Sequence, residues 1–412
     1  MATTLFVLDA FRNDYICESN TPFLFECSKK GEYYKRVIPS FGFCERTEIF
    51  TGLKPKESGF FTAIGYDPEN SPFNGLSFPK SLEKFESLIQ NFGIKGIIPD
   101  GFLQAILRKI INNRLNSKKY RMNIYNIPFP LLHYWALTED RIDHRDPEAF
   151  SVPSIFSLLL KHNKSFFYDS FTALNIPANG TDFDRIRLAL DDMKRNNRHF
   201  YLVYISMPDY LGHKYGPNSI QLKKGLQQLD RELKKYYDEV LEISPKNNFI
   251  FLGDHGMATV KVYFNAEKEI LSIAKKNSLD LKKDYIYFLD STIVRLWYFS
   301  KKAKIVFNDW LKVSNKFNNL GIFITKRLAE KEHIPWNDRR YGDILWWANT
   351  GVLVYPDFFH RVEKYRGMHG YNPLKKQNQG TCIVYGHKID KYYQDQISLS
   401  GIYSVLKKTL YL

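Results

Sequence analysis

Three short apolar runs that each end in an aspartate constrain the fold of this chain more than any other feature. They are TTLFVLDAF near the start, FYLVYISMPD at 200–209 and NNFIFLGDHG at 247–256. Their content of Val, Ile, Leu, Phe and Tyr is typical of buried parallel strands. Because ligands bind beyond the carboxyl ends of such strands, Asp9, Asp209 and Asp254 are expected to share one rim of a sheet.

Helical patterns lie between these runs. Residues 182–196 and 219–243 repeat apolar side chains at helical spacing, so the sequence predicts an α/β fold with a mostly parallel central sheet flanked by helices. The stretches at about 100–150 and 259–350 fit this core less well and are interpreted as insertions that cover the rim. Neither a repeat nor a low-complexity linker divides the chain, which favours a single domain over 1–412.

Composition narrows the class of protein. With 44% hydrophobic residues the chain is globular, and its net charge of +15 favours anionic partners, although a compositional bias of the genome would give the same excess of lysine. The basic segment RKIINNRLNSKKYRM matches no nucleic-acid motif, and a solvated helix face is the simpler interpretation. Four cysteines without CxxC spacing, no apolar stretch of about 20 residues and no signal-peptide pattern predict a cytoplasmic protein with reduced thiols and no transmembrane segment.

Histidines beside the rim aspartates point to divalent metals. DYLGH brings His213 close to Asp209 in an expected strand-end loop, GDHG places His255 next to Asp254 in an expected turn, and RGMHGYNP supplies His369. Carboxylate and imidazole are ligands of zinc, and three imidazoles favour zinc over manganese. Each piece alone could be a cap or a turn, but with Asp9 they make six ligands. Six ligands suit two metals with three each, an arrangement that serves phosphoryl transfer.

In order along the chain, Asp9, TGLKPKESG, PDYLGHKYGP, GDHGM and RGMHGYNP resemble the type I phosphodiesterase and nucleotide pyrophosphatase family of the alkaline phosphatase superfamily. The resemblance runs from Asp9 to Pro373. It implies an alkaline-phosphatase-like fold and cleavage or transfer at a phosphodiester or phosphoanhydride bond of a small phosphate-containing substrate, such as a nucleotide or nucleotide sugar. It also implies two zinc ions, one held by Asp209, His213 and His369 and the other by Asp9, Asp254 and His255.

The loop IPSFGFCERTEIFTG departs from that family. The Thr or Ser nucleophile of the family would fall on Gly42, and an Asn that contacts the phosphate would fall on Glu45. Ser40 could act as nucleophile instead, or Cys44 or Thr47 could. Alternatively no side chain attacks, and a hydroxide activated by the metals or an acceptor hydroxyl reacts directly. Glu45 could then be an extra metal ligand or a base for the acceptor.

Other side chains near these motifs allow two interpretations each. Arg46 could clamp a phosphate or form an ion pair with Glu48 or another acid. Asp338, Arg339 and Arg340 could reach the substrate or hold the second insertion in place. The aromatic pairs Tyr134–Trp135 and Trp346–Trp347 could stack a base, but core packing is the more common role of such residues.

Two rival functions are compatible with the sequence. The altered loop favours a phosphotransferase or phosphohydrolase acting on sugar phosphates or surface-polysaccharide precursors, because an unusual loop suggests an unusual donor or acceptor. A catalytically inactive anion-binding protein would explain Gly42, but an inactive protein has no need of all six ligands.

Overall fold

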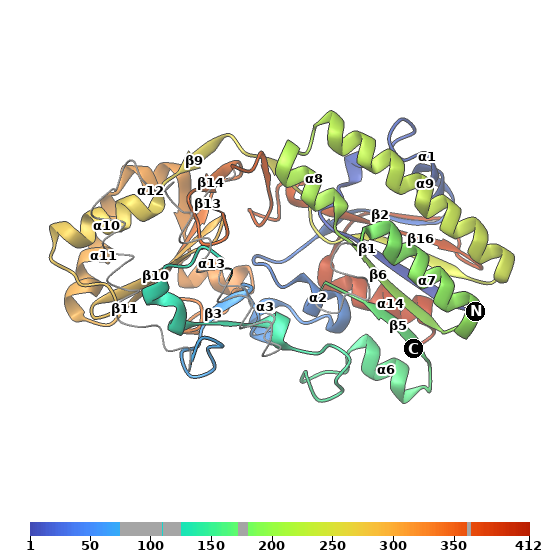
Figure 1. Ribbon diagram of the computed structural model, residues 1–412, viewed down its shortest axis with the longest axis horizontal. Helices are drawn as coiled ribbons and strands as arrows, with labels where there is room; N and C mark the ends of the chain where they lie inside the picture. Colours follow the sequence, from blue (N-terminus) through green and yellow to red (C-terminus); the bar gives the residue numbers. More distant parts are fainter. Residues whose placement is uncertain (75–108, 110–124, 172–179, 361–363) are drawn as a thin grey trace.

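The computed structural model describes residues 1–74, 109, 125–171, 180–360 and 364–412 (Figure 1). The basic segment and much of the first predicted insertion lie outside these residues. Figure 1 shows two lobes, one built on a large sheet that carries both termini and one built on a smaller sheet from the second predicted insertion.

The large sheet is the predicted α/β core. Its seven strands follow the order β17 (Tyr392–Ser398), β2 (Glu32–Ile38), β16 (Gly380–Gly386), β7 (Asn248–Gly253), β1 (Thr3–Leu8), β6 (Phe200–Ile205) and β5 (Phe166–Asp169). All run parallel except β16, which is antiparallel to both of its neighbours. Leu8 pairs with Ile205 on one side and Gly253 on the other, so β1, β6 and β7 end at the same level. The mostly parallel sheet predicted from the sequence is confirmed.

Helices cover both faces of this sheet, which explains why its strands are apolar without alternation. One face packs against α1 (Pro22–Lys30), α7 (Asp182–Asn196) and α9 (Ile220–Ile243), and the other against α2 (Glu45–Thr51), α6 (Ile155–Lys161) and α14 (Ile402–Leu410). Along β1, Phe6 and Leu8 face the first group while Leu5 and Val7 face the second. Complete burial of each such side chain stabilises the fold by about 2 kcal/mol.

The second lobe contains an antiparallel sheet of β10 (Tyr285–Leu289), β11 (Ile293–Tyr298), β13 (Ile344–Ala348) and β12 (Gly321–Phe323). Helices α10 (Ala266–Lys276), α11 (Lys301–Val313) and α12 (Asn315–Leu320) belong to the same lobe (Figure 1). Trp135, Trp346 and Trp347 are buried in hydrophobic cores, and the indole N–H of Trp346 donates to the carbonyl of Phe317 at 3.0 Å. These side chains are core residues and not a stacking surface for a base.

Short elements complete the described chain. The remaining helices are α3 (Pro55–Ser58), α8 (Met207–Tyr215), α13 (Lys326–Lys331) and five 3₁₀ turns at Asn13–Tyr15, Phe129–Tyr134, Glu139–Arg141, Lys376–Asn378 and Leu399–Gly401. The remaining strands are β3 (Ile64–Tyr66), β4 (Trp135–Leu137), β8 (Ala258–Thr259), β9 (Val262–Phe264), β14 (Val352–Val354) and β15 (Gly367–Met368). Within the described ranges, none of the helices has the length and apolarity needed to cross a membrane. The four cysteines form no disulfide.

Candidate metal centre

Helix α8 carries the first pair of candidate ligands. The prediction of a strand-end loop for DYLGH was wrong, because Met207–Tyr215 is helical and begins with Pro208 in its first turn. Residues four apart lie on the same face of a helix, so Asp209 and His213 face one another. The imidazole Nε2 of His213 lies 3.1 Å from Oδ1 of Asp209, and Nε2 of His369 lies 3.6 Å from the same oxygen.

The second group forms where β1 and β7 end. Nε2 of His255 lies 3.1 Å from Oδ1 of Asp9 and 3.9 Å from Oδ1 of Asp254. The backbone N–H groups of Ala10 and His255 both donate to Asp254, at 3.2 and 2.9 Å, which fixes that carboxylate at the rim. The hydroxyl of Tyr204 on β6 donates to Oδ2 of Asp9.

These residues make two triads that touch each other. Asp209, His213 and His369 form the first triad and Asp9, Asp254 and His255 the second, and within each triad the ligand atoms lie within 4.8 Å of one another. The rings of His255 and His369 stack with centroids 4.2 Å apart, so the two triads are neighbours. The structure thus brings the six residues together in the grouping expected from the sequence, while their role as metal ligands stays a prediction.

The charges of the centre are unbalanced in a way that suits a cation. Burial raises the pKa of Asp254 to about 8, and the carboxylates of Asp9 and Glu45 act in the same direction against the opposing charge of His255. Burial followed by the charge of Asp209 also raises the pKa of Asp9. Burial followed by His255 lowers the pKa of His369 well below its usual range, so this imidazole is neutral, as a metal ligand must be.

Unpaired polar atoms support the same fit. Oδ1 of Asp209 and Nδ1 of His369 are buried and accept or donate no hydrogen bond from the described residues. Nδ1 of His213 lies 2.9 Å from the carbonyl of Gly367, and Nδ1 of His255 lies 3.0 Å from that of Gly256. A carbonyl only accepts, so both Nδ1 atoms carry a proton, and Nε2 is the ring nitrogen that each imidazole would offer to a cation. The donor set therefore fits divalent metals.

Two glycines flank Asp254 and His255 for a reason other than the one expected. The sequence suggested that Gly253 and Gly256 permit a tight turn, but neither has a left-handed φ. A Cβ on Gly253 would lie 1.9 Å from the carbonyl oxygen of Phe11, and one on Gly256 would lie 2.4 Å from that of Gln377. Close approach of neighbouring backbone, and not the turn, requires glycine here.

The loop between β2 and α2 lies against both triads. Helix α2 begins at Glu45, so Glu45 and Thr47 lie in its first turn and not in an extended loop as the sequence suggested. The ring of Phe43 packs edge-on against the ring of His369, with centroids 5.7 Å apart. Glu45 contributes to the electrostatic field at both Asp254 and His255. Gly42 has φ 122° and lies in this loop next to Phe43.

The candidate nucleophiles of the sequence all lie near this loop. Ser40 donates its hydroxyl to Oε2 of Glu48 at 2.9 Å and its backbone N–H to Oε1 at 3.1 Å. Cys44 is buried, and burial together with the charges of Glu139 and Glu45 raises its pKa well above the usual range. Thr47 is buried at 1% exposure, and its hydroxyl lies 3.4 Å from Nε2 of His144.

Glu45, the possible base of the loop, is half-buried, and burial raises the pKa of its carboxyl to about 7.

An ion pair that the sequence did not locate anchors α2. Arg46 pairs with Glu139 at 2.9 Å and with Asp140, which agrees with the alternative of an ion pair with an acid other than Glu48. Oε1 of Glu139 also accepts the backbone N–H of Thr47 at 2.6 Å. Because 93 residues separate Arg46 from Glu139, no local signal could have identified this pair. Tyr204 was missed for a different reason, since its place in an apolar strand resembles that of any core aromatic.

The stretch before the last histidine serves the second lobe. Asp338 and Arg340 form an ion pair with each other, and the backbone carbonyl of Arg340 accepts the N–H of Tyr66 at 2.7 Å. The carbonyl of Arg339 accepts the indole N–H of Trp297 at 2.6 Å. These contacts favour the interpretation that the segment holds the second insertion in place.

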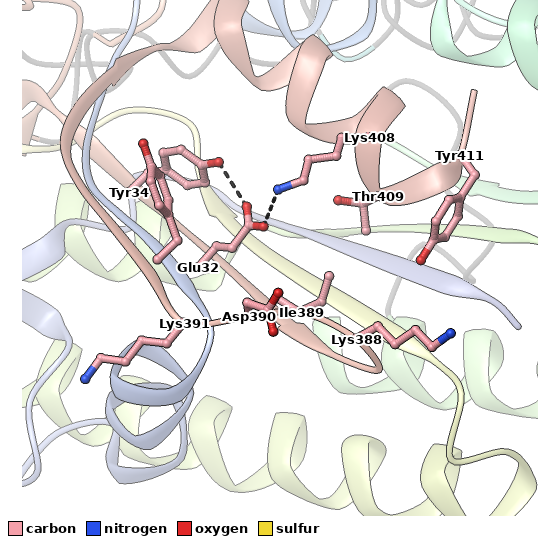
Figure 2. A pocket seen from close by; sticks show the side chains of 10 residues that line it. Glu32, Tyr34, Lys388, Ile389, Asp390, Lys391, Lys408, Thr409 and Tyr411 are labelled. Atoms are coloured by element: carbon pink, nitrogen blue, oxygen red, sulfur yellow. Dashed lines mark hydrogen bonds and ion pairs between the residues drawn. The ribbon is translucent and has the colours of Figure 1, made fainter.

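A cavity of about 580 Å³ opens at the opposite end of the large sheet, where β2 begins (Figure 2). Figure 2 shows Glu32 at its centre, with the hydroxyl of Tyr34 and the ammonium of Lys408 directed toward its carboxylate. Both oxygens of this buried acid therefore have partners. The cavity lies away from the strand ends that carry the triads, and it contributes nothing to the centre.

Comparison with known proteins identifies the family. The family model of type I phosphodiesterase / nucleotide pyrophosphatase matches residues 3–372. The chain belongs to this family. One relative is mouse ectonucleotide pyrophosphatase/phosphodiesterase family member 1. It is 26% identical to this chain over a region that covers 62% of the chain and 24% of the relative. The venom phosphodiesterase of Naja atra is 23% identical over 89% of the chain and 41% of the relative. The matched part of this chain thus spans less than half the length of these two relatives.

Solved structures confirm the fold of the family member. Murine ectonucleotide pyrophosphatase/phosphodiesterase 5, an inactive form in complex with AMP, superposes with a TM-score of 0.67 at 16% identity. The match covers 100% of the present chain and 95% of the murine one. The alkaline-phosphatase-like fold expected from the sequence is therefore confirmed.

Proposed function

We propose that the chain is a two-metal hydrolase that cleaves a phosphodiester or phosphoanhydride bond in a small phosphate-containing molecule. The observation that carries this proposal is the pair of neighbouring triads beyond the carboxyl ends of β1, β6 and β7, joined by the stacked rings of His255 and His369. Membership of the family supports the reaction class.

In this proposal each triad holds one divalent cation, and the three imidazoles favour zinc. Bound there, two cations neutralise phosphoryl oxygens and lower the pKa of the attacking group. The chain supplies the orientation of the ligands. The carbonyls of Gly256 and Gly367 fix the tautomers of His255 and His213, and the hydroxyl of Tyr204 holds Asp9.

Nucleotides and nucleotide sugars are the proposed substrates. The bound AMP in the murine neighbour supports a nucleotide. Two aromatic rings border the centre. The half-buried ring of Phe43 lies against His369, and the exposed ring of Phe171 packs edge-on against Tyr204. A second candidate, transfer to or from sugar phosphates or polysaccharide precursors, is favoured by the glycine at position 42, because the altered loop changes what can face the phosphorus.

Metal content and diester cleavage test the proposal together. Purified protein is expected to hold about two zinc ions per chain and to cleave bis(4-nitrophenyl) phosphate until a chelator is added. His369→Ala is expected to lose one metal and turnover, and the exposed His162→Ala is the matched control. A panel of nucleotide sugars, dinucleotides and sugar phosphates separates the two candidates. Cleavage that persists in metal-free protein would contradict the proposal.

A further inference from the structure

The loop between β2 and α2 reaches both triads without bringing a hydroxyl or a thiol to them. Phe43 lies against His369 of one triad, and Glu45 influences His255 of the other. Gly42 precedes Phe43 in this loop. Gly42, in the middle of this loop, therefore brings no side chain to the metal centre.

The backbone around Gly42 leaves no room for a side chain. The carbonyl oxygen of Phe61 accepts the N–H of Phe43 at 2.9 Å, and a Cβ on Gly42 would lie 2.2 Å from that same oxygen. The φ of 122° is also one that L side chains rarely adopt. The glycine is thus built into the fold of the loop, and a hydroxyl-bearing residue could not take its place without moving the backbone.

The neighbouring hydroxyls have partners away from the triads, and the neighbouring thiol is buried. The hydroxyl and the backbone N–H of Ser40 both donate to Glu48, a buried residue of α2. Cys44 is buried, and burial raises the pKa of its thiol well above the usual range, so the reactive thiolate is disfavoured. Thr47 lies within α2 against His144. None of these three groups points to the triads through a contact in the described part of the chain.

Glu45 is the polar side chain of the loop that remains. It is half-buried, and within the described residues no other side chain forms a hydrogen bond or an ion pair with its carboxylate. Two neighbouring acids do have such partners: Glu48 accepts from Ser40, and Glu139 pairs with Arg46. The carboxylate accepts a hydrogen bond from the N–H of its own residue, Glu45, and no described side chain competes with a ligand for it.

From these contacts we infer that the attacking oxygen comes from outside the chain, from water or an acceptor hydroxyl, and that Glu45 holds it. This inference rests on the proposed function. In the step, the attacking oxygen forms a bond to phosphorus while its proton passes to the Glu45 carboxylate. The bond from phosphorus to the leaving oxygen breaks, and that oxygen keeps the electron pair and takes up a proton from solvent. One displacement occurs, no phosphoryl-enzyme forms, and the configuration at phosphorus inverts.

Stereochemistry at phosphorus distinguishes one displacement from two. The probe is a single diastereomer of the 4-nitrophenyl ester of thymidine 5′-phosphorothioate, cleaved by the metal-loaded protein in water containing methanol. The methyl ester product is examined by ³¹P nuclear magnetic resonance. Inversion is the expected result. Retention would overturn the inference, and so would a phosphoryl adduct on the intact protein after an acid quench during turnover.

Variants test the role of Glu45. Glu45→Gln is expected to lower kcat about 10²- to 10⁴-fold with little change in KM and with two metals still bound, and Glu45→Asp is expected to recover part of the loss. Ser40→Ala is expected to keep turnover within about threefold. The matched control is Glu26→Gln, because Glu26 is an exposed acid that pairs with Lys30.

Loss of turnover in Ser40→Ala with a normal fold, or full kcat in Glu45→Gln, would overturn the inference and leave the proposed function standing. Metal-loaded wild-type protein that cleaves no member of the panel would overturn the proposed function and this inference with it.

Discussion

Glu139→Gln is expected to destabilise the fold by about 3 kcal/mol. The Glu139 side chain is 1% exposed, and its carboxylate accepts from the guanidinium of Arg46 and from the N–H of Thr47 in the first turn of α2. Burial is the largest single influence and opposes the charge, but the charge of Arg46 and the contacts with His144 and Thr47 together outweigh it and lower the pKa of Glu139 from 4.5 to about 2. A difference of that size between the folded and unfolded chain corresponds to about 3 kcal/mol. Breaking a buried ion pair costs about 3–5 kcal/mol, which agrees.

The pH dependence of the same variant has a definite sign. Because the folded pKa of Glu139 lies below the unfolded one, its stabilisation is complete above pH 4.5 and is lost as the pH falls toward 2. The difference in free energy of unfolding between wild type and Glu139→Gln is therefore expected to narrow from about 3 kcal/mol at pH 7 to about 1 kcal/mol at pH 3.

Urea titrations followed by circular dichroism measure both quantities. Glu148→Gln is the matched control, since Glu148 is an exposed acid a few residues further along and is expected to change stability by less than about 0.5 kcal/mol. A difference below 1 kcal/mol at pH 7 for Glu139→Gln, or one that does not shrink in acid, would refute the reasoning.

Three further outcomes follow from single contacts. Gly42→Ser is expected to lower the free energy of unfolding by at least about 2 kcal/mol without raising diester cleavage, because the Cβ of the serine would meet the carbonyl of Phe61. A stable and more active variant would contradict this. Asp230→Ala is expected to cost about 2–3 kcal/mol in urea titration at unchanged kcat, because the N–H groups of Phe23 and Leu24 lose their acceptor; a loss of kcat would show that α1 matters to the centre. Adding a chelator is expected to lower the melting temperature of wild type in a differential scanning experiment, because cations bound to the folded chain stabilise it; an unchanged melting temperature would speak against tightly held metals.

The core of the fold could be predicted because its signals are local. Buried strands such as β1 consist of consecutive apolar residues, and helices such as α9 repeat them at helical spacing, so each element is encoded within its own stretch. The aspartates at the strand ends could be placed on one rim for the same reason, since parallel strands bring their carboxyl ends together.

The local structure of α8 could not be predicted because its signals are tertiary. DYLGH was expected in a strand-end loop because it follows an apolar strand, yet it is helical, and Gly216 ends the helix. Gly212 lies inside it, where a Cβ would come 2.4 Å from the sulfur of Met257. A contact with a residue 45 positions away thus selects the glycine, and a single sequence carries no sign of that contact.

The loop after β2 shows why a motif can be located and its chemistry still missed. The sequence places Gly42 at the position where the family carries its nucleophile, and from the sequence alone a small shift that brings Ser40 to the metals is as reasonable as direct attack. The decisive facts are non-local: Phe61 fills the space beside Gly42, and Glu48 takes both polar groups of Ser40. Because both contacts hold the loop as it stands, a shift of Ser40 toward the triads would have to break them, and Glu45, which has no such partner, is the side chain free to act.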